Sequence, residues 1–215
     1  GSVVHTLSNI TSPSVQYDKA DYDTDFPASE DLTSYLTNVG FETGDLTGWS
    51  QDEGSWENES SEAGTVPHSG DRLASSNGLS GNNIATISQT LDIRDLSLAG
   101  NASVEAKIWM ATASSDGDQG NIKIAALDAN GNELGSNESG WTSTTEDTWQ
   151  EVSSGSLSVH EDAVEVKVSI TVDDFTLEID DLTLSASRSG TGKITVDVYQ
   201  ISAQVGRGHP RRAYV

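Results

Sequence analysis

The sequence predicts an all-β protein: a two-sheet antiparallel jelly-roll sandwich with an extended N-terminal arm and a C-terminal strand and arm. Three observations lead to this prediction. Apolar residues alternate with polar ones in several segments, as in strands that bury one face. Turn residues separate these segments at short intervals, which is typical of sandwiches and barrels. The composition is rich in Ser, Thr and Gly and contains one Met, which favours strands over helices.

Three segments show the strand pattern most clearly. In residues 104–110 every second side chain is apolar, so one face of a strand is buried. Residues 164–172 alternate in the same way without a break. A third run covers residues 175–184, but its alternation changes phase, which predicts a bulge at Asp180 and Asp181. Weaker strands are expected at residues 53–58, 71–76, 84–93, 121–128 and 147–158, with a tight turn at 130–132.

The pattern divides the chain into three parts. Residues 1–36 have neither a helix nor a strand period and are acidic, which predicts an extended arm, with a disordered leader as the alternative. Residues 37–187 hold the jelly roll. Residues 188–215 contain a linker, a long strand from Ile194, and a tail, with five basic side chains and one acidic side chain in all. The strand has no hairpin partner in the sequence, so we expect it to complete this sheet or to join the sheet of a neighbouring subunit.

The net charge of −23 and the lack of cysteine exclude several classes of function. A surface this negative repels nucleic-acid phosphates and anionic lipids. Without cysteine there is no disulfide, thiol nucleophile or zinc-thiolate site. No apolar run approaches the roughly 20 residues of a membrane-spanning helix. We therefore expect neither nucleic acid nor membrane as a partner.

No motif in the sequence supports catalysis. The four histidines are dispersed, and none has a metal-binding spacing. A nucleophile elbow, a phosphate loop and a dinucleotide-binding glycine pattern are all absent from the sequence. The 34 acidic residues are so numerous that close carboxylate pairs arise by chance, so they do not predict a glycosidase. We expect that the protein is not an enzyme.

An outward-facing tryptophan predicts a binding surface. Alternation turns Trp109 away from the core, on the same face as Glu105 and Lys107. Sugars stack their apolar faces on indole rings, and their hydroxyls pair with charged or amide groups nearby. We predict a glycan site at Trp109, Glu105 and Lys107, with Trp56 and Trp141 as further platforms. The alternative for each tryptophan is a ring covered by a loop or by a neighbouring subunit.

Residues 38–49 resemble the opening motif of the galactose-binding-like β-jelly rolls, the superfamily of many carbohydrate-binding modules. The sequence there is Asn-Val-Gly-Phe-Glu-Thr-Gly-Asp-Leu-Thr-Gly-Trp. Residues 68–71 (His-Ser-Gly-Asp) resemble the Ser-Gly loop of the family, and residues 175–184, which contain Ile-Asp-Asp, resemble its closing strand. We expect Phe41 and Trp49 to anchor the first strand on the core. The resemblance covers residues 37–187 and implies the jelly-roll fold, but it leaves both arms unexplained.

The resemblance also implies a structural calcium ion. In the family this ion is held by the glutamate of the opening motif, the closing aspartate and backbone carbonyls of the Ser-Gly loop. The matching residues here are Glu42, Asp180 and the loop that contains His68 and Asp71. Two carboxylates at close range repel each other unless a cation lies between them, and hard oxygen ligands favour Ca²⁺. The alternative is that both acids are solvated at strand ends.

The arms favour a non-enzymatic structural protein of a bacteriophage virion, located at the particle surface or outside the cell. Residues 196–206 resemble short segments of phage head and tail proteins, and extended arms can fasten copies together. The residues expected to contact other virion subunits in a homo-oligomer are Tyr199, Ile201, Arg207, Arg211 and Arg212. The jelly roll would then be displayed on a head, neck or tail and could bind host surface polysaccharide. The alternative is a carbohydrate-binding module of a secreted polysaccharide-degrading enzyme, and a bacterial cell-surface adhesion domain is a third interpretation.

Overall fold

The structure is a computed structural model that describes residues 21–23, 29–62, 64–76, 79–113, 118–188 and 193–195. The chain divides into two compact units. One unit is Phe26–Gly190, and the other is formed by Gly1–Asp25 together with Thr191–Val215. In the described ranges, no helix is long and apolar enough to cross a membrane.

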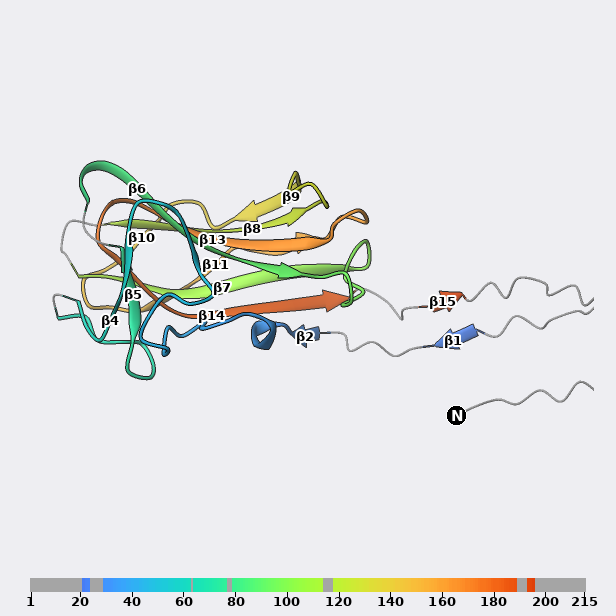
Figure 1. Ribbon diagram of the computed structural model, residues 1–215, viewed down its shortest axis with the longest axis horizontal. Coiled ribbons are helices and arrows are strands. Elements are labelled where there is room, and N and C mark those ends of the chain that lie inside the picture. Colours follow the sequence, from blue (N-terminus) through green and yellow to red (C-terminus); the bar gives the residue numbers. More distant parts are fainter. Residues whose placement is uncertain are drawn as a thin grey trace, which may run out of the picture. The chain divides into compact units, whose positions relative to one another are not determined.

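The larger unit is a sandwich of two antiparallel sheets (Figure 1). In spatial order the first sheet contains β11 (Gln150–Ser153), β7 (Ala102–Thr112), β14 (Leu177–Arg188), β5 (Leu73–Ser76) and β4 (Trp56–Glu59), with β12 (Leu157–Ser158) also on β7 and β2 (Ser29–Asp31) also on β14. The second sheet contains β10 (Thr142–Ser143), β8 (Gln119–Leu127), β13 (Glu165–Phe175), β6 (Leu79–Asp92) and β3 (Ser50–Glu53), with β9 (Glu133–Glu138) also on β8. The predicted all-β jelly-roll sandwich is therefore confirmed.

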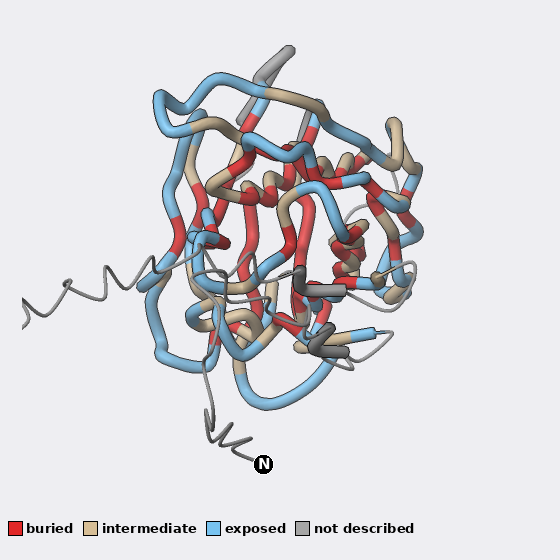
Figure 2. Tube along the Cα trace, turned by 90° about the vertical axis from the view of Figure 1, so that its right-hand side faces the viewer, coloured by how far each residue is buried: buried red, intermediate tan, exposed pale blue. Residues whose placement is uncertain are grey.

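Alternating side chains from both sheets form one hydrophobic core between them (Figure 2). Along β7, buried and partly exposed residues alternate from Ala102 to Met110. In β13 the inward side chains run from Val166 to Val172 and are at most 1% exposed. The alternation predicted for residues 104–110 is thus confirmed, and that predicted for residues 164–172 is confirmed from Val166 onward, because Val164 precedes β13 and is only partly buried. Removing apolar surface from water stabilises the fold by roughly 25 cal/mol per Å², so these rows hold the two sheets together.

The predicted bulge in the closing strand is also present. The register of β14 against β7 shifts between Asp180 and Thr183, and Asp181 has a φ of 50°. Beyond the bulge, Leu182 and the later apolar residues of β14 face the core again. The N–H of Leu182 donates to the carbonyl of Val39 at 3.0 Å. The bulge therefore places the opening motif directly beside the closing strand.

The sandwich begins earlier than the predicted boundary at residue 37. β2 pairs with the end of β14, and Leu32 is fully buried just before the short 3-10 helix η1 (Thr33–Tyr35). The Arg188 side chain, 6% exposed, forms an ion pair with Glu30 at 2.9 Å. Residues 29–36 are therefore part of the sandwich and not of an arm. A single buried leucine in polar sequence creates no period, which explains why the sequence did not reveal this.

The sequence also fails to predict β9. Its residues are mostly exposed, and among the described strands it pairs with β8 alone. An edge strand with little buried surface needs no apolar alternation. The turn that precedes it is the one expected at residues 130–132, where the N–H of Gly131 donates to the carbonyl of Asp128 at 3.0 Å.

The smaller unit contains one described pair of strands. β1 (Asp21–Asp23) is antiparallel to β15 (Lys193–Thr195), and Asp23 lies opposite Lys193. The start of the C-terminal strand, which had no partner in the sequence, thus pairs with the N-terminal arm. The five predicted assembly residues lie outside the described residues; they are Tyr199, Ile201, Arg207, Arg211 and Arg212.

Candidate functional site

The opening motif folds into a turn that is fixed by its own side chains. The Asn38 amide accepts the N–H of Thr43 at 3.1 Å and donates to the carbonyl of Asp45 at 2.9 Å. Phe41 is fully buried and stacks on Trp49, with 5.1 Å between the ring centroids. The indole N–H of Trp49 donates to the carbonyl of Asn38 at 3.0 Å. These rings anchor the turn on the core, as the sequence predicted.

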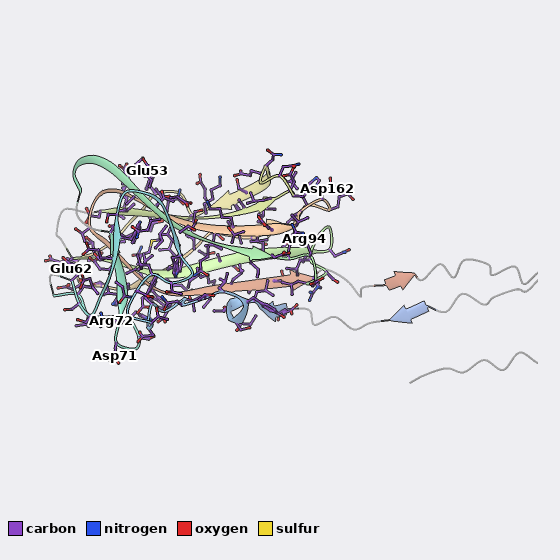
Figure 3. All side chains as sticks on the ribbon, viewed as in Figure 1. Glu53, Glu62, Asp71, Arg72, Arg94 and Asp162 are labelled. Carbon is purple, nitrogen blue, oxygen red and sulfur yellow. The ribbon has the colours of Figure 1, made fainter. Side chains whose placement is uncertain are left out.

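Glu42, next in the motif, contacts the Ser-Gly loop. Its carboxylate accepts the backbone N–H of Asp71 at 3.0 Å and that of Arg72 at 3.1 Å. Asp71 and Arg72 lie at one end of the sandwich (Figure 3). Gly70 has a φ of +61°, and a Cβ at that position would collide with the Glu42 carboxylate. The glycine therefore allows the loop to approach Glu42 this closely.

Asp180 reaches the same loop from the closing strand. It is fully buried, and its Oδ2 accepts the N–H of Ser69 at 3.1 Å. Burial raises the pKa of Asp180 to about 6; the Ser69 N–H acts in the opposite direction, and the neighbouring charge of Asp181 raises the pKa further. A buried carboxylate of this kind is stabilised by any added positive charge.

The two predicted calcium ligands contact the same loop: Asp180 accepts the N–H of Ser69, and Glu42 accepts those of Asp71 and Arg72. A Cβ on Gly40 would lie 3.2 Å from Asp181 Oδ1, 3.8 Å from Asp180 Oδ1 and 4.0 Å from Glu42 Cγ. Carboxylate oxygens of Asp180 and Asp181 therefore lie close to this glycine, whereas Glu42 approaches it only with a side-chain carbon. Oxygen donors of this type suit Ca²⁺.

The other two predicted metal residues have different contacts. His68 Nδ1 lies 2.7 Å from Asp181 Oδ2, while Asp71 contributes its backbone N–H to Glu42. Throughout the described ranges, no three His, Asp or Glu side chains are grouped so that they could hold a metal ion. A calcium ion at Glu42 and Asp180 would therefore need main-chain oxygens or water as well, and its presence stays a prediction.

His68, Ser69 and Asp181 form a polar cluster on the surface. Ser69 Oγ donates to Asp181 Oδ1 at 2.9 Å, and His68 contacts the other oxygen of the same carboxylate. In a Ser-His-Asp relay the histidine lies between the other two groups. Here the aspartate lies between them, so the cluster fixes the loop to the bulge.

Trp109 faces outward, as alternation predicted, but a loop covers part of it. The ring is partly buried, and the His68 imidazole stacks on it with 4.0 Å between centroids and 16° between planes. Trp149 packs edge-on against His68 at 5.9 Å and donates its indole N–H to the carbonyl of Val66 at 2.9 Å. One face of the Trp109 indole is therefore unavailable to a sugar.

Glu105 and Lys107 stand on the same face of β7 and already have partners. Lys107 Nζ lies 3.2 Å from Glu151 Oε2, and Ser153 Oγ donates to Glu105 Oε1 at 2.5 Å. Both contacts reach the neighbouring strand β11. Glu105 and Lys107, which were expected to bind a glycan, are therefore held in place by pairs with residues of β11.

The prediction that Trp56 is a stacking platform for sugars is wrong. Trp141 is the more accessible ring. Trp56 is 2% exposed and belongs to the core. It is the first residue of the four-residue strand β4, which is too short to show from sequence which face is buried. Trp141 is 46% exposed, next to β10.

Glu178 is a buried acid that the sequence did not single out. It is fully buried, and neither carboxylate oxygen has a hydrogen-bond partner. Burial raises its pKa to about 8; weaker contacts with backbone N–H groups oppose this shift, and the charges of Glu62 and Asp118 add to it. Glu178 occupies an outward position of β14, where alternation predicts exposure. Only the tertiary structure shows that this part of the sheet is covered.

Solved structures with a similar fold share little sequence with the chain. The enzymatically active domain of tailspike protein 4 from bacteriophage CBA120 has a TM-score of 0.54 at 12% identity, over 74% of this chain and 21% of that one. The CBM22-1 xylan-binding domain of Paenibacillus barcinonensis has a TM-score of 0.54 at 14% identity, over 71% of this chain and 94% of that domain. The C-terminal family 22 carbohydrate-binding module of Clostridium thermocellum Xyn10B has a TM-score of 0.51 at 17% identity, over 76% and 99%.

These likenesses establish the architecture. No protein-family model matches the sequence, and no curated protein is significantly similar to it. The chain spans about a fifth of the tailspike domain and nearly the whole of the two carbohydrate-binding modules. The sandwich shares the jelly-roll fold of these carbohydrate-binding modules.

Proposed function

We propose that the protein is a non-enzymatic structural component of a bacteriophage particle, located at the virion surface, whose jelly roll binds a host-surface polysaccharide. The observation that carries the glycan-binding part is the fold, which matches carbohydrate-binding modules over 94% and 99% of their lengths. The likeness to a tailspike domain supports the phage part. The pairing of β1 with β15 supports a role for the arms, because it links residues 21–23 to residues 193–195 within one compact unit.

The glycan surface that we favour is centred on Trp141. This ring is exposed, and the adjacent Thr142 lies opposite Gly120 in the sheet. Polar groups are available on the paired strands: the Asn121 amide donates to Glu138 Oε2 at 2.9 Å. A pyranose that stacks on the indole could pair its hydroxyls with such amide and carboxylate groups. Trp109, on the outer face of the first sheet, is a separate candidate contact through the part of its ring that His68 leaves open.

Replacing Trp141 with alanine tests this surface. In affinity electrophoresis against a panel of soluble polysaccharides, W141A should bind about tenfold more weakly than the parent chain, because one aromatic stacking contact is lost. Tyr35 is 52% exposed and provides a matched control, so Y35A should keep its affinity. Equal binding by the parent chain and W141A would remove Trp141 from the site.

We also propose a structural calcium ion held by Glu42 and Asp180. When bound, it would neutralise two carboxylates that contact the same loop, and it would fix the opening motif to the closing strand. Chelation of metal-loaded protein should then lower the melting temperature, by mass action. An unchanged melting temperature, in protein first shown to contain calcium, would argue against the ion.

The second candidate function is a carbohydrate-binding module of a secreted polysaccharide-degrading enzyme. The likeness to family 22 modules over nearly their whole length favours it. Light scattering separates the two functions, because only the virion protein needs its arms for assembly. We expect the full chain to form an oligomer and a chain ending at Gly190 to be monomeric. A full chain that is monomeric at both low and high salt would favour the enzyme module.

A further inference from the structure

A row of polar side chains crosses the outer face of the second sheet from strand to strand. On β13, Thr171 lies opposite Asn121 of β8 on one side and opposite Thr86 of β6 on the other. Glu53 of β3 lies opposite Thr86 and ends the row. The four side chains are exposed or partly exposed, whereas the residues next to them along β6, β8 and β13 are buried in the core. We call these four residues the polar row.

Trp141 lies at the other end of the polar row. Thr142 is opposite Gly120, so continuing the register by one residue brings Trp141 beside Asn121. A Cβ on Gly120 would collide with Met110 in the core, so Gly120 and its partner Thr142 face inward, and Trp141 faces outward. Neighbouring strands lie about 4.8 Å apart, so the row and the indole together extend for roughly 19 Å across five strands. This length accommodates several pyranose rings of an extended chain.

The two bases on this face are already paired with acids. Lys123 and Lys167 are the basic residues of the six strands of the second sheet. Lys123 Nζ lies 2.7 Å from Glu133 Oε2, and Lys167 Nζ lies 2.6 Å from Asp52 Oδ2. The hydrogen bond from Lys123 lowers the pKa of Glu133, and that from Ser136 lowers it further, so this acid keeps its charge at neutral pH.

Further acids lie along the polar row itself. Glu138 Oε2 accepts the Asn121 amide at 2.9 Å. Asp173 is exposed on β13, two residues past the row and on the same face, and Glu53 is exposed at its end. Charges interact over a screening length of about 8 Å at physiological salt, so an acidic sugar on the row would be repelled by these carboxylates. The hydroxyl and amide groups of the row carry no charge and suit uncharged sugar hydroxyls instead.

We propose that the site at Trp141 takes an uncharged, extended polysaccharide that stacks one ring on the indole and crosses the strands along the polar row. The hydroxyls of Thr86 and Thr171, 3.1 Å apart, and the amide of Asn121 supply both donors and acceptors for sugar hydroxyls. This inference rests on the proposed glycan binding, and it adds the chemical class of the polysaccharide and the direction in which it lies.

Pairs of polysaccharides that share a backbone but differ in charge test the proposal. The probes are dextran with carboxymethyl dextran, and acidic bacterial capsular polysaccharides with the same polymers after reduction of their carboxyl groups. Each is titrated into the full-length chain at low and high salt. At low salt the uncharged member should bind about tenfold more tightly than the acidic member, and high salt should narrow this difference, because it screens the repulsion.

Two outcomes of these titrations count against the proposal in different ways. Equal or tighter binding of the acidic members at low salt would overturn the proposal and leave the glycan-binding function standing. A folded chain that binds neither the charged nor the uncharged polysaccharides would contradict the proposed function and this inference together.

Glu53→Lys and Asp162→Lys distinguish the polar row from the overall negative charge. Both acids are exposed, and Figure 3 labels them at opposite ends of the sandwich. E53K places a base on the row, so at low salt it should raise the affinity for the acidic member several-fold relative to the uncharged member. D162K makes the same change in charge away from the row and should keep the affinity ratio of the parent chain. Equal ratios for folded E53K and D162K would overturn the proposed path along the row.

Discussion

The buried carboxyl of Glu178 should make stability depend on pH in a way that one substitution removes. Burial raises its pKa from the ordinary value of 4.5 to about 8. Because the pKa is higher in the folded state, the contribution to stability is fully present below pH 4.5 and is lost as the pH rises through 8. Each unit of pKa shift corresponds to about 1.4 kcal/mol, so the total loss amounts to roughly 5 kcal/mol, most of it between pH 5 and 8.

Glu178→Gln isolates this loss. Urea unfolding of both proteins from pH 5 to 9, in the presence of a chelator, gives the free energy of unfolding at each pH. The parent chain should lose several kcal/mol more than E178Q over this range. The pKa of Asp180 is also raised, so its contribution to stability falls with rising pH in both proteins. The difference between the two unfolding curves therefore reports on Glu178. Parallel curves for the two proteins would refute the reasoning.

Three further substitutions test the packing around the candidate site. Trp109→Ala should lower the free energy of unfolding by about 2 kcal/mol, because the ring is partly buried and stacks on His68. An unchanged free energy of unfolding would mean that the stack is absent in solution. Gly70→Ala should lower the free energy of unfolding well beyond Gly44→Ala. Both glycines have positive φ, but a Cβ would collide with the Glu42 carboxylate only at Gly70, and a Cβ at Gly44 would meet open space. The Gly44 change should cost about 1 kcal/mol, and equal losses would contradict the contact. Arg188→Ala should lower the free energy of unfolding by about 2 kcal/mol, because the side chain pairs with Glu30 and donates to the carbonyl of Leu96. A loss near zero would place residues 29–31 outside the sandwich.

Features with a local signal could be predicted from the sequence. The long strands are visible because their apolar residues alternate, and the phase change at Asp180 and Asp181 reveals the bulge. The roles of Phe41 and Trp49 follow from bulky rings that flank a glycine turn. The proximity of Glu42, the Ser-Gly loop and Asp180 was available only through the resemblance to a known fold, because nothing local joins these segments.

Features that depend on contacts between distant segments could not be predicted. Alternation correctly turns Trp109 outward, but it contains no information about the His68 ring that covers one face. The same rule would expose Glu178, which a distant part of the chain buries. Trp56 was misjudged because β4 has only four residues and no clear period. In each case the burial of a side chain was decided by packing, which the strand pattern does not describe.

Direct binding of polysaccharide by the full-length, calcium-loaded chain tests the central claim most directly. Calorimetric titration with bacterial surface polysaccharides, and with xylan for comparison, measures this without any assumption about the site. The proposed function predicts saturable binding to at least one bacterial surface polysaccharide, and weaker binding by W141A. Folded protein that binds none of the bacterial polysaccharides would contradict the claim, and binding to xylan alone would favour the module of a secreted enzyme.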